Sequence, residues 1–200
     1  MRLDRFRIIT NVSTGLTGMV IAREFARRGF KVKLLQGPTC LHRPKEKVDV
    51  EEFKYFEELK DKLIRELSHT HYQAIIHAAA VSDYRPFRVY TGKIKSQQNS
   101  FILKLRPTPK LISIIRRRAQ DSLVVQFKLE ANITLRQLID IARHSLEENR
   151  TNIVVANRQE DVKQDRYRGY IIDSSGEIMA VKTRQQLAEK LCKIVESLRR

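Results

Sequence analysis

The chain has 200 residues, 42% of them hydrophobic, which suffices for one globular domain with a sizeable core and makes two domains a tight fit. Its 39 lysines and arginines outnumber 23 aspartates and glutamates, and the formal charge of +16 favours anionic partners. These basic residues are dispersed along the chain, which is more typical of a solvated surface than of a nucleic-acid-binding face. No apolar run approaches membrane-spanning length, and the charged start is unlike a signal peptide.

The two cysteines, Cys40 and Cys192, lie far apart in the sequence and match no metal-binding or redox spacing. Such sparse cysteine usage is typical of a reducing compartment. We therefore expect a cytoplasmic protein, and we assign no protein ligands to a metal.

Short β-branched runs alternate with longer segments of helical period, a pattern that predicts an α/β domain with a mainly parallel sheet. In chain order, the pattern first predicts a helix over 15–28 that is stopped by Gly29, a strand over 31–35, a charged helix over 51–66 and a strand over 74–77. A basic helix over 109–118, a strand over 123–127 and a helix after the N-cap Thr134 follow. The last predicted elements are a strand over 153–156, a hairpin of 169–172 and 177–181, and a helix over 184–198. Residues 38–48 and 158–167 are expected to be polar connectors.

The segment Thr10–Gly18 leads directly into the first predicted helix and contains Gly15 and Gly18 among several hydroxyl side chains. Backbone N–H groups and the positive end of the helix dipole make such a place suitable for a phosphate, although an ordinary helix start carries the same residues. A reductase dinucleotide loop is a further interpretation, but the full glycine fingerprint is missing, as is a tyrosine-lysine pair at helical spacing. Asn11 could grip a carboxylate or carbonyl, or serve as a turn residue.

The segment His77–Pro86 follows a predicted buried strand, begins with small residues and then turns polar. In open α/β sheets, ligands bind beyond the carboxyl ends of the strands, where small side chains allow close approach. Asp83 could hold a magnesium ion or a ribose hydroxyl, or simply cap a turn. Lys93 and Lys95 alternate with Ile94, so an extended segment would present both ammonium groups to a polyphosphate, or protect an exposed sheet edge.

Taken together, these segments resemble phosphopantothenoylcysteine synthetase, also called phosphopantothenate–cysteine ligase. The similarity extends over nearly the whole chain, with motif order and spacing in agreement. The box A-V-S-D-Y-x-P followed by K-I-K is specific to this family. The motifs that carry the resemblance are Arg7–Gly15, Ala78–Pro86, Lys93–Lys95, Pro107–Ile112, Phe127–Glu130 and Val155–Asn157.

The resemblance implies a Rossmann-like three-layer sandwich, a single synthetase domain over 1–200, and a homodimer with no membrane or nucleic-acid partner. It also implies a role in coenzyme A biosynthesis, the nucleotide-dependent ligation of 4′-phosphopantothenate to L-cysteine through an acyl-nucleotide intermediate. CTP is the expected co-substrate, with ATP less favoured, and Mg²⁺ is expected to screen the triphosphate. The competing interpretation is a non-catalytic nucleotide- or nucleic-acid-binding module of Rossmann-like fold.

The resemblance also implies roles for individual residues. Lys93 aligns with the lysine that stabilises charge on the nucleotide phosphates during activation. Asn11 aligns with the asparagine that holds the acyl intermediate, and Arg7 with an arginine that binds the pantothenate phosphate or carboxylate. The positions that align with nucleotide contacts are Ala78, Ala79, Asp83, Lys93, Phe127 and Lys128.

Two features depart from the family pattern. The family usually begins with another strand and a T-S-G-G-T loop, whereas here Met1 lies six residues before Arg7. We expect either a truncated product or mis-started gene model, or a surrogate strand formed by Phe6–Ile9. Bifunctional members carry two lysines toward the triphosphate where this chain has Ser145 and Asn149. Because Lys128 instead follows Phe127, as in stand-alone synthetases, the resemblance implies a monofunctional member.

Overall fold

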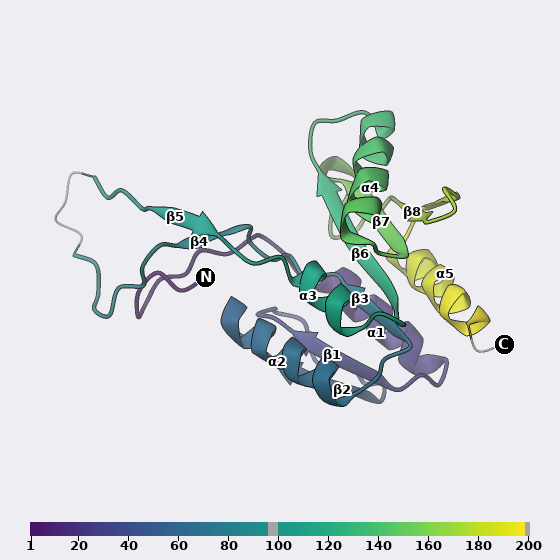
Figure 1. Ribbon diagram of the computed structural model, residues 1–200, viewed down its shortest axis with the longest axis horizontal. Helices are drawn as coiled ribbons and strands as arrows, with labels where there is room; N and C mark the ends of the chain where they lie inside the picture. The colour runs from purple at the N-terminus through teal and green to yellow at the C-terminus, as the bar shows by residue number, and fades with distance from the viewer. Residues whose placement is uncertain (96–99, 199–200) are drawn as a thin grey trace.

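The structure is a computed structural model that describes residues 1–95 and 100–198 (Figure 1). The helices are α1 (Leu16–Arg27), α2 (Phe56–His69), α3 (Leu111–Arg118), α4 (Leu135–Asn149) and α5 (Arg184–Ser197). The strands are β1 (Val32–Gln36), β2 (Val48–Glu52), β3 (Ala74–His77), β4 (Tyr84–Pro86), β5 (Leu105–Pro107), β6 (Leu123–Glu130), β7 (Ile153–Arg158), β8 (Gly169–Asp173) and β9 (Ile178–Val181).

The main sheet has the strand order β3-β6-β7-β8-β9. Its first three strands are parallel, and the hairpin β8–β9 adds two antiparallel strands at the far side. A separate parallel pair is formed by β1 and β2. Within the described residues, ladder pairing joins β1 to β2 and β3 to β6, but not β1 to β3. The predicted α/β class, mainly parallel sheet and C-terminal hairpin are thus confirmed.

Helices cover both faces of the sheet because the two central strands are apolar on both sides. Val124 and Val125 on β6 are neighbours that are both fully buried, and successive side chains of a strand point to opposite faces. Val125 packs in a cluster with residues of α1 and α5, whereas Val124 packs with residues of α2 and α3. The chain therefore folds as the Rossmann-like three-layer arrangement that the resemblance implies.

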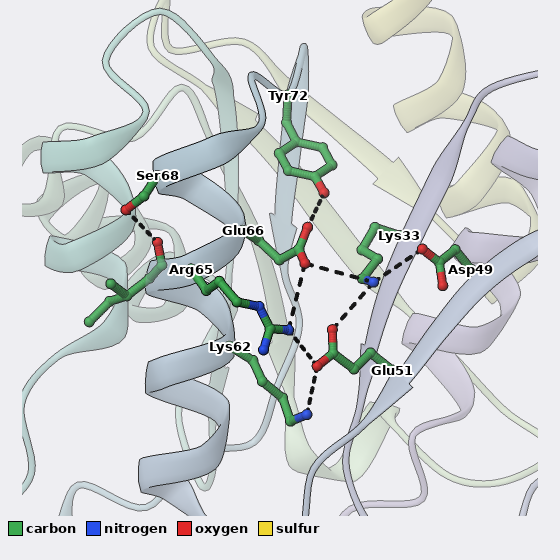
Figure 2. A network of polar contacts seen from close by, with 9 residues as sticks. Lys33, Asp49, Glu51, Lys62, Arg65, Glu66, Ser68 and Tyr72 are labelled. Carbon is green, nitrogen blue, oxygen red and sulfur yellow. Dashed lines mark hydrogen bonds and ion pairs between the residues drawn. The ribbon is translucent and has the colours of Figure 1, made fainter.

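The predicted helix over 51–66 is wrong at its beginning, because residues 48–52 form β2 and the helix starts only at Phe56. The charged side chains that suggested an exposed helix face instead form ion pairs between this strand and neighbouring elements. Figure 2 shows Glu51 between Lys62 and Arg65 of α2, each with its nitrogen 2.6 Å from the carboxylate. Lys33 of β1 completes the link, since its ammonium lies 3.3 Å from Glu51. The network attaches α2 to the β1–β2 pair.

The proposed surrogate strand Phe6–Ile9 is also wrong. The N-terminal segment folds back on itself, with a bridge between Arg2 and Ile8 and a hydrogen bond of 2.7 Å from the Ile9 N–H to the Met1 carbonyl. Its carbonyl at Leu3 accepts from the Tyr90 N–H at 2.9 Å. The segment therefore lies along residues 90–94 instead of joining the main sheet.

An arm projects from the body of the protein, at the left of Figure 1, and is built on the antiparallel strands β4 and β5. The N-terminal segment lies beside it (Figure 1). We call the described residues 84–95 and 100–107 the arm. The described arm residues Lys93–Lys95 belong to no strand, although Ile94 is buried between the two exposed lysines. Among the described residues, no helix has the length and apolar character needed to cross a membrane.

Candidate functional site

Several of the predicted nucleotide-binding residues follow the carboxyl ends of neighbouring parallel strands. The register pairs His77, the last residue of β3, with Gln126 of β6. Ala78 and Ala79 therefore leave the sheet beside the position where Phe127 and Lys128 continue β6. The exposed Ala79 methyl leaves room for a ligand near the backbone at this edge.

The side chains on β6 are held by their neighbours. Phe127 is half-buried and packs against the cluster that contains α1 and α5. The Lys128 ammonium lies 3.0 Å from the Glu130 carboxylate, so its charge is partly balanced within the strand. Burial lowers the pKa of His77 to about 4, which keeps this imidazole neutral at pH 7. His77 therefore adds no cation to the strand end.

Asn11 meets the polar segment after β3. Its side-chain amide donates to the Val81 carbonyl at 3.1 Å, which links the segment before α1 to the box that contains Asp83. The segment after β1 reaches the same region, because the Thr39 hydroxyl donates to the Thr14 carbonyl at 2.7 Å. Three segments that are distant in sequence thus converge at the start of α1.

The start of α1 has the geometry expected for an anion. Its N-cap is Gly15, which adopts a left-handed φ of 74° and supplies no side-chain acceptor to the helix. Only glycine adopts this conformation without steric cost. The Leu16 N–H of the first turn donates to the Thr14 hydroxyl at 3.3 Å, and the positive end of the helix dipole lies at this turn.

Asp83 lies in an ion pair that its sequence context did not indicate. The Lys110 ammonium is 2.7 Å from its carboxylate, and both side chains are about two-thirds exposed, at 67% and 68%. The Thr108 N–H also donates to the Asp83 carbonyl at 2.8 Å. Lys110 precedes α3, so the pair ties the base of the arm to that helix.

Arg7 and Lys93 come together through the N-terminal segment. The Arg7 guanidinium forms a salt bridge of 2.8 Å with Asp4 and donates to the Ile94 carbonyl at 2.7 Å. The Lys93 ammonium lies 5.9 Å from the centre of the Phe6 ring, a cation–π distance. Two nitrogens of the Arg7 guanidinium, Nε and Nη2, thus already form hydrogen bonds within the protein.

The second lysine of the K-I-K segment faces an open cavity. Lys95 lines a volume of about 520 Å³ together with Arg88, Tyr90 and Phe101. Within residues 1–95 and 100–198, no hydrogen bond or ion pair joins Lys93 to Asn11 or Asp83. The predicted residues thus form two groups, one at the strand ends and one at the arm.

The described residues include no cluster of three or more His, Cys, Asp or Glu side chains that could hold a metal ion. Mg²⁺ in nucleotide sites is usually held by one or two carboxylates together with the phosphates and several waters. The single carboxylate of Asp83 is compatible with that mode.

Comparison with known proteins identifies the domain. The family of the DNA/pantothenate metabolism flavoprotein C-terminal domain matches residues 1–198. The chain is 32% identical, over 98% of its length, to the coenzyme A biosynthesis bifunctional protein CoaBC of Thermococcus kodakarensis, and covers 48% of that protein. It is 30% identical to the CoaBC protein of Methanocaldococcus jannaschii over 78% of this chain and 37% of the relative. The chain therefore spans about half the length, or less, of these relatives.

Solved structures share the fold. The DNA/pantothenate metabolism flavoprotein from Streptococcus pneumoniae has a TM-score of 0.87 and 27% identity, with 98% of this chain and 93% of that chain covered. The Cab2 mutant H337A in complex with phosphopantothenate-cysteine has a TM-score of 0.80 over 98% of this chain and 83% of that chain. At 16% identity, the second likeness shows the fold alone. The resemblance drawn from the motifs is confirmed: the chain belongs to the family of the DNA/pantothenate metabolism flavoprotein C-terminal domain.

Proposed function

We propose that this domain ligates 4′-phosphopantothenate to L-cysteine in coenzyme A biosynthesis, with CTP as the co-substrate. The observation that carries the proposal is the contact of Asn11 with the Val81 carbonyl, which joins two family motifs at the strand ends. The names of the relatives support a place in coenzyme A biosynthesis.

The reaction would proceed in two steps. The carboxylate of phosphopantothenate attacks the α-phosphorus of CTP, an acyl phosphate bond forms, and pyrophosphate leaves. The cysteine amine then attacks the acyl carbon, an amide bond forms, and CMP leaves with the acyl oxygen while the amine loses its proton. Activation is needed because a carboxylate by itself is a poor acyl donor at neutral pH.

Different residues would act in the two steps. The Lys93 ammonium would balance the charge that develops on the phosphates during activation, where a preorganised charge is most effective. The Asn11 amide would hold the acyl intermediate from the strand-end side. Arg7 would offer the phosphopantothenate its remaining guanidinium nitrogen, since its Nε and Nη2 already contact Asp4 and Ile94.

The nucleotide would lie over the small residues that follow β3. Ala78 and Ala79 would leave space for it, Phe127 would contact it from β6, and the start of α1 would face a phosphate. Asp83 would hold a ribose hydroxyl or Mg²⁺, whose charge would screen the triphosphate. Its ion pair with Lys110 is no obstacle, because an exposed pair contributes only about 0–1 kcal/mol and is easily exchanged. Lys128 would add positive charge once the triphosphate competes with Glu130.

The homodimer would use the arm. Large apolar side chains are exposed along it, and contiguous exposed apolar surface is typical of protein–protein contacts. They are Tyr84, Phe87, Val89, Phe101, Ile102 and Leu105. A second copy of the chain is the occupant that we propose for this surface.

The proposal is tested by incubating the protein with CTP, Mg²⁺, phosphopantothenate and L-cysteine, and by detecting phosphopantothenoylcysteine by mass spectrometry. The expected result is one pyrophosphate and one CMP for each product molecule, with a lower rate when ATP replaces CTP. The high positive charge also suits a non-catalytic nucleotide-binding module. Binding of CTP without product from either nucleotide would favour that alternative and overturn the ligase.

A further inference from the structure

Asp4 is a buried carboxylate whose two oxygens have different partners. The side chain belongs to a residue that is 1% exposed. Its Oδ1 accepts from the backbone N–H groups of Phe6 and Arg7, both at 2.8 Å, and so shapes the turn of the N-terminal segment. Its Oδ2 accepts from the Arg7 guanidinium and, at 3.2 Å, from the Ile94 N–H.

Ile94 is therefore held at both of its backbone polar groups. Its N–H donates to Asp4, and its carbonyl accepts from Arg7 at 2.7 Å. Its side chain is also buried, at 9% exposure. These two contacts span 90 and 87 positions of the sequence, and they fix the backbone next to Lys93.

The charge on Asp4 is well maintained. Burial by itself raises the pKa of this carboxyl, but the N–H groups of Phe6, Ile94 and Arg7, together with the Arg7 guanidinium, lower it well below its usual range. Asp4 is thus ionised at neutral pH, and its hydrogen bonds to Arg7 and Ile94 are charge-assisted.

We propose that Asp4 is the positioning residue for Lys93, acting through the Asp4–Arg7–Ile94 contacts to hold the lysine where it meets the nucleotide phosphates. The inference rests on the proposed ligase function, and nothing in it requires Asp4 to touch substrate. Preorganisation matters here because a displacement of about 1 Å in a charged group can cost about a hundredfold in rate.

The variant Asp4→Asn separates the two oxygens. Its carbonyl oxygen can keep the turn contacts with the N–H groups of Phe6 and Arg7, while its NH₂ group replaces Oδ2 and faces only donors. We expect hydrogen exchange at the Ile94 amide to accelerate by at least about tenfold. We expect kcat for pyrophosphate release to fall by at least about tenfold, with KM for CTP changed by less than about threefold.

The matched control is Asp140→Asn, an exposed aspartate on α4, which should match the wild type in both measurements. Unchanged exchange at Ile94 would overturn the proposal, and so would a kcat near the wild-type value. A raised KM for CTP with unchanged kcat would also overturn it. Should Asp4→Asn fail to fold, Asp4→Glu keeps the charge but lengthens the side chain by one methylene, which displaces the acceptor oxygen from the Ile94 N–H, and exchange at Ile94 gives the same test.

The ligase function and the role of Asp4 can be overturned by different results. A wild-type protein that makes no product would overturn the ligase function and, with it, the role of Asp4 in positioning Lys93 for that reaction. Fast exchange at Ile94 in the wild type would instead overturn the Asp4 contacts while leaving the ligase intact.

Discussion

The side-chain amide of Asn11 donates a hydrogen bond of 3.1 Å to the backbone carbonyl of Val81, 70 residues further along the chain. Asn11 precedes the first helix, and Val81 lies in the box that follows β3. The bond therefore fixes the distance between two segments that both carry residues of the proposed site.

Asn11→Ala should separate the two chemical steps. Without the amide, the acyl-nucleotide loses a hydrogen-bond donor, and losing one such donor typically costs a factor of about 10²–10³. Rapid-quench analysis should show a pyrophosphate burst of up to one equivalent per site, followed by slow formation of phosphopantothenoylcysteine. Val12→Ala, at the adjacent fully exposed side chain, is the control. Equal slowing of both steps in Asn11→Ala would contradict the assigned role.

Glu51→Gln should destabilise the protein at neutral pH and much less in acid. Hydrogen bonds from Lys62 and Arg65 lower the pKa of Glu51 to about 2, whereas its ordinary value is 4.5. A carboxyl with a depressed pKa contributes its stability above the unfolded-state pKa, and the contribution disappears as the pH falls toward the folded-state value. Circular dichroism should therefore show a lower Tm for the variant at pH 7 and a narrowing difference between pH 5 and pH 3.

The control for this prediction is Glu147→Gln, an exposed glutamate on α4. Its Tm should stay close to that of the wild type at every pH. A difference between Glu51→Gln and the wild type that stays constant from pH 7 to pH 3 would mean that the ion pairs of Figure 2 do not hold α2 on the β1–β2 pair.

Ile102→Glu should convert the proposed homodimer to monomers. Ile102 is 88% exposed, so the charge is tolerated in the isolated chain but would be buried in an interface through the arm. Sedimentation velocity should show a dimer for the wild type and a monomer for the variant. Leu198→Glu, at an exposed apolar residue after α5, should remain dimeric. A monomeric wild type, or a dimeric Ile102→Glu, would exclude the arm as the interface.

Elements with strong local signals were predictable from the sequence. Thr134 was expected to cap a helix, and its hydroxyl accepts from the Gln137 N–H while the Gln137 side chain accepts from the Thr134 N–H. The short β-branched runs of β6 and β7 predicted two strands of a mainly parallel sheet. The turn residues Asp173–Gly176 predicted a hairpin, which the structure contains as β8–β9.

Elements that depend on distant partners were not predictable. Val48 and Val50 alternate with charged residues, and their strand exists because β1 pairs with it and because Lys62 and Arg65 balance Glu51. The strands of the arm have three residues each and both end in proline, which weakens any local strand signal.

The candidate site was predictable only in part, for the same reason. Asn11 and Asp83 were indicated by family motifs, and the contact between Asn11 and the box that contains Asp83 could be seen only in three dimensions. Asp4 lies outside the motifs that carry the resemblance, and Lys110 lies within Pro107–Ile112 without an assigned role. Their importance comes from Ile94 and Asp83, which lie far from them in sequence.

The most direct test of the account is the initial rate of pyrophosphate release from CTP and phosphopantothenate by Lys93→Gln. The glutamine keeps most of the side-chain length and removes the charge, so the rate should fall by at least about a hundredfold if Lys93 stabilises the activation step. Lys182→Gln, at an exposed lysine after β9, should stay within about twofold of the wild type. Equal rates for Lys93→Gln and the wild type would contradict the proposed mechanism.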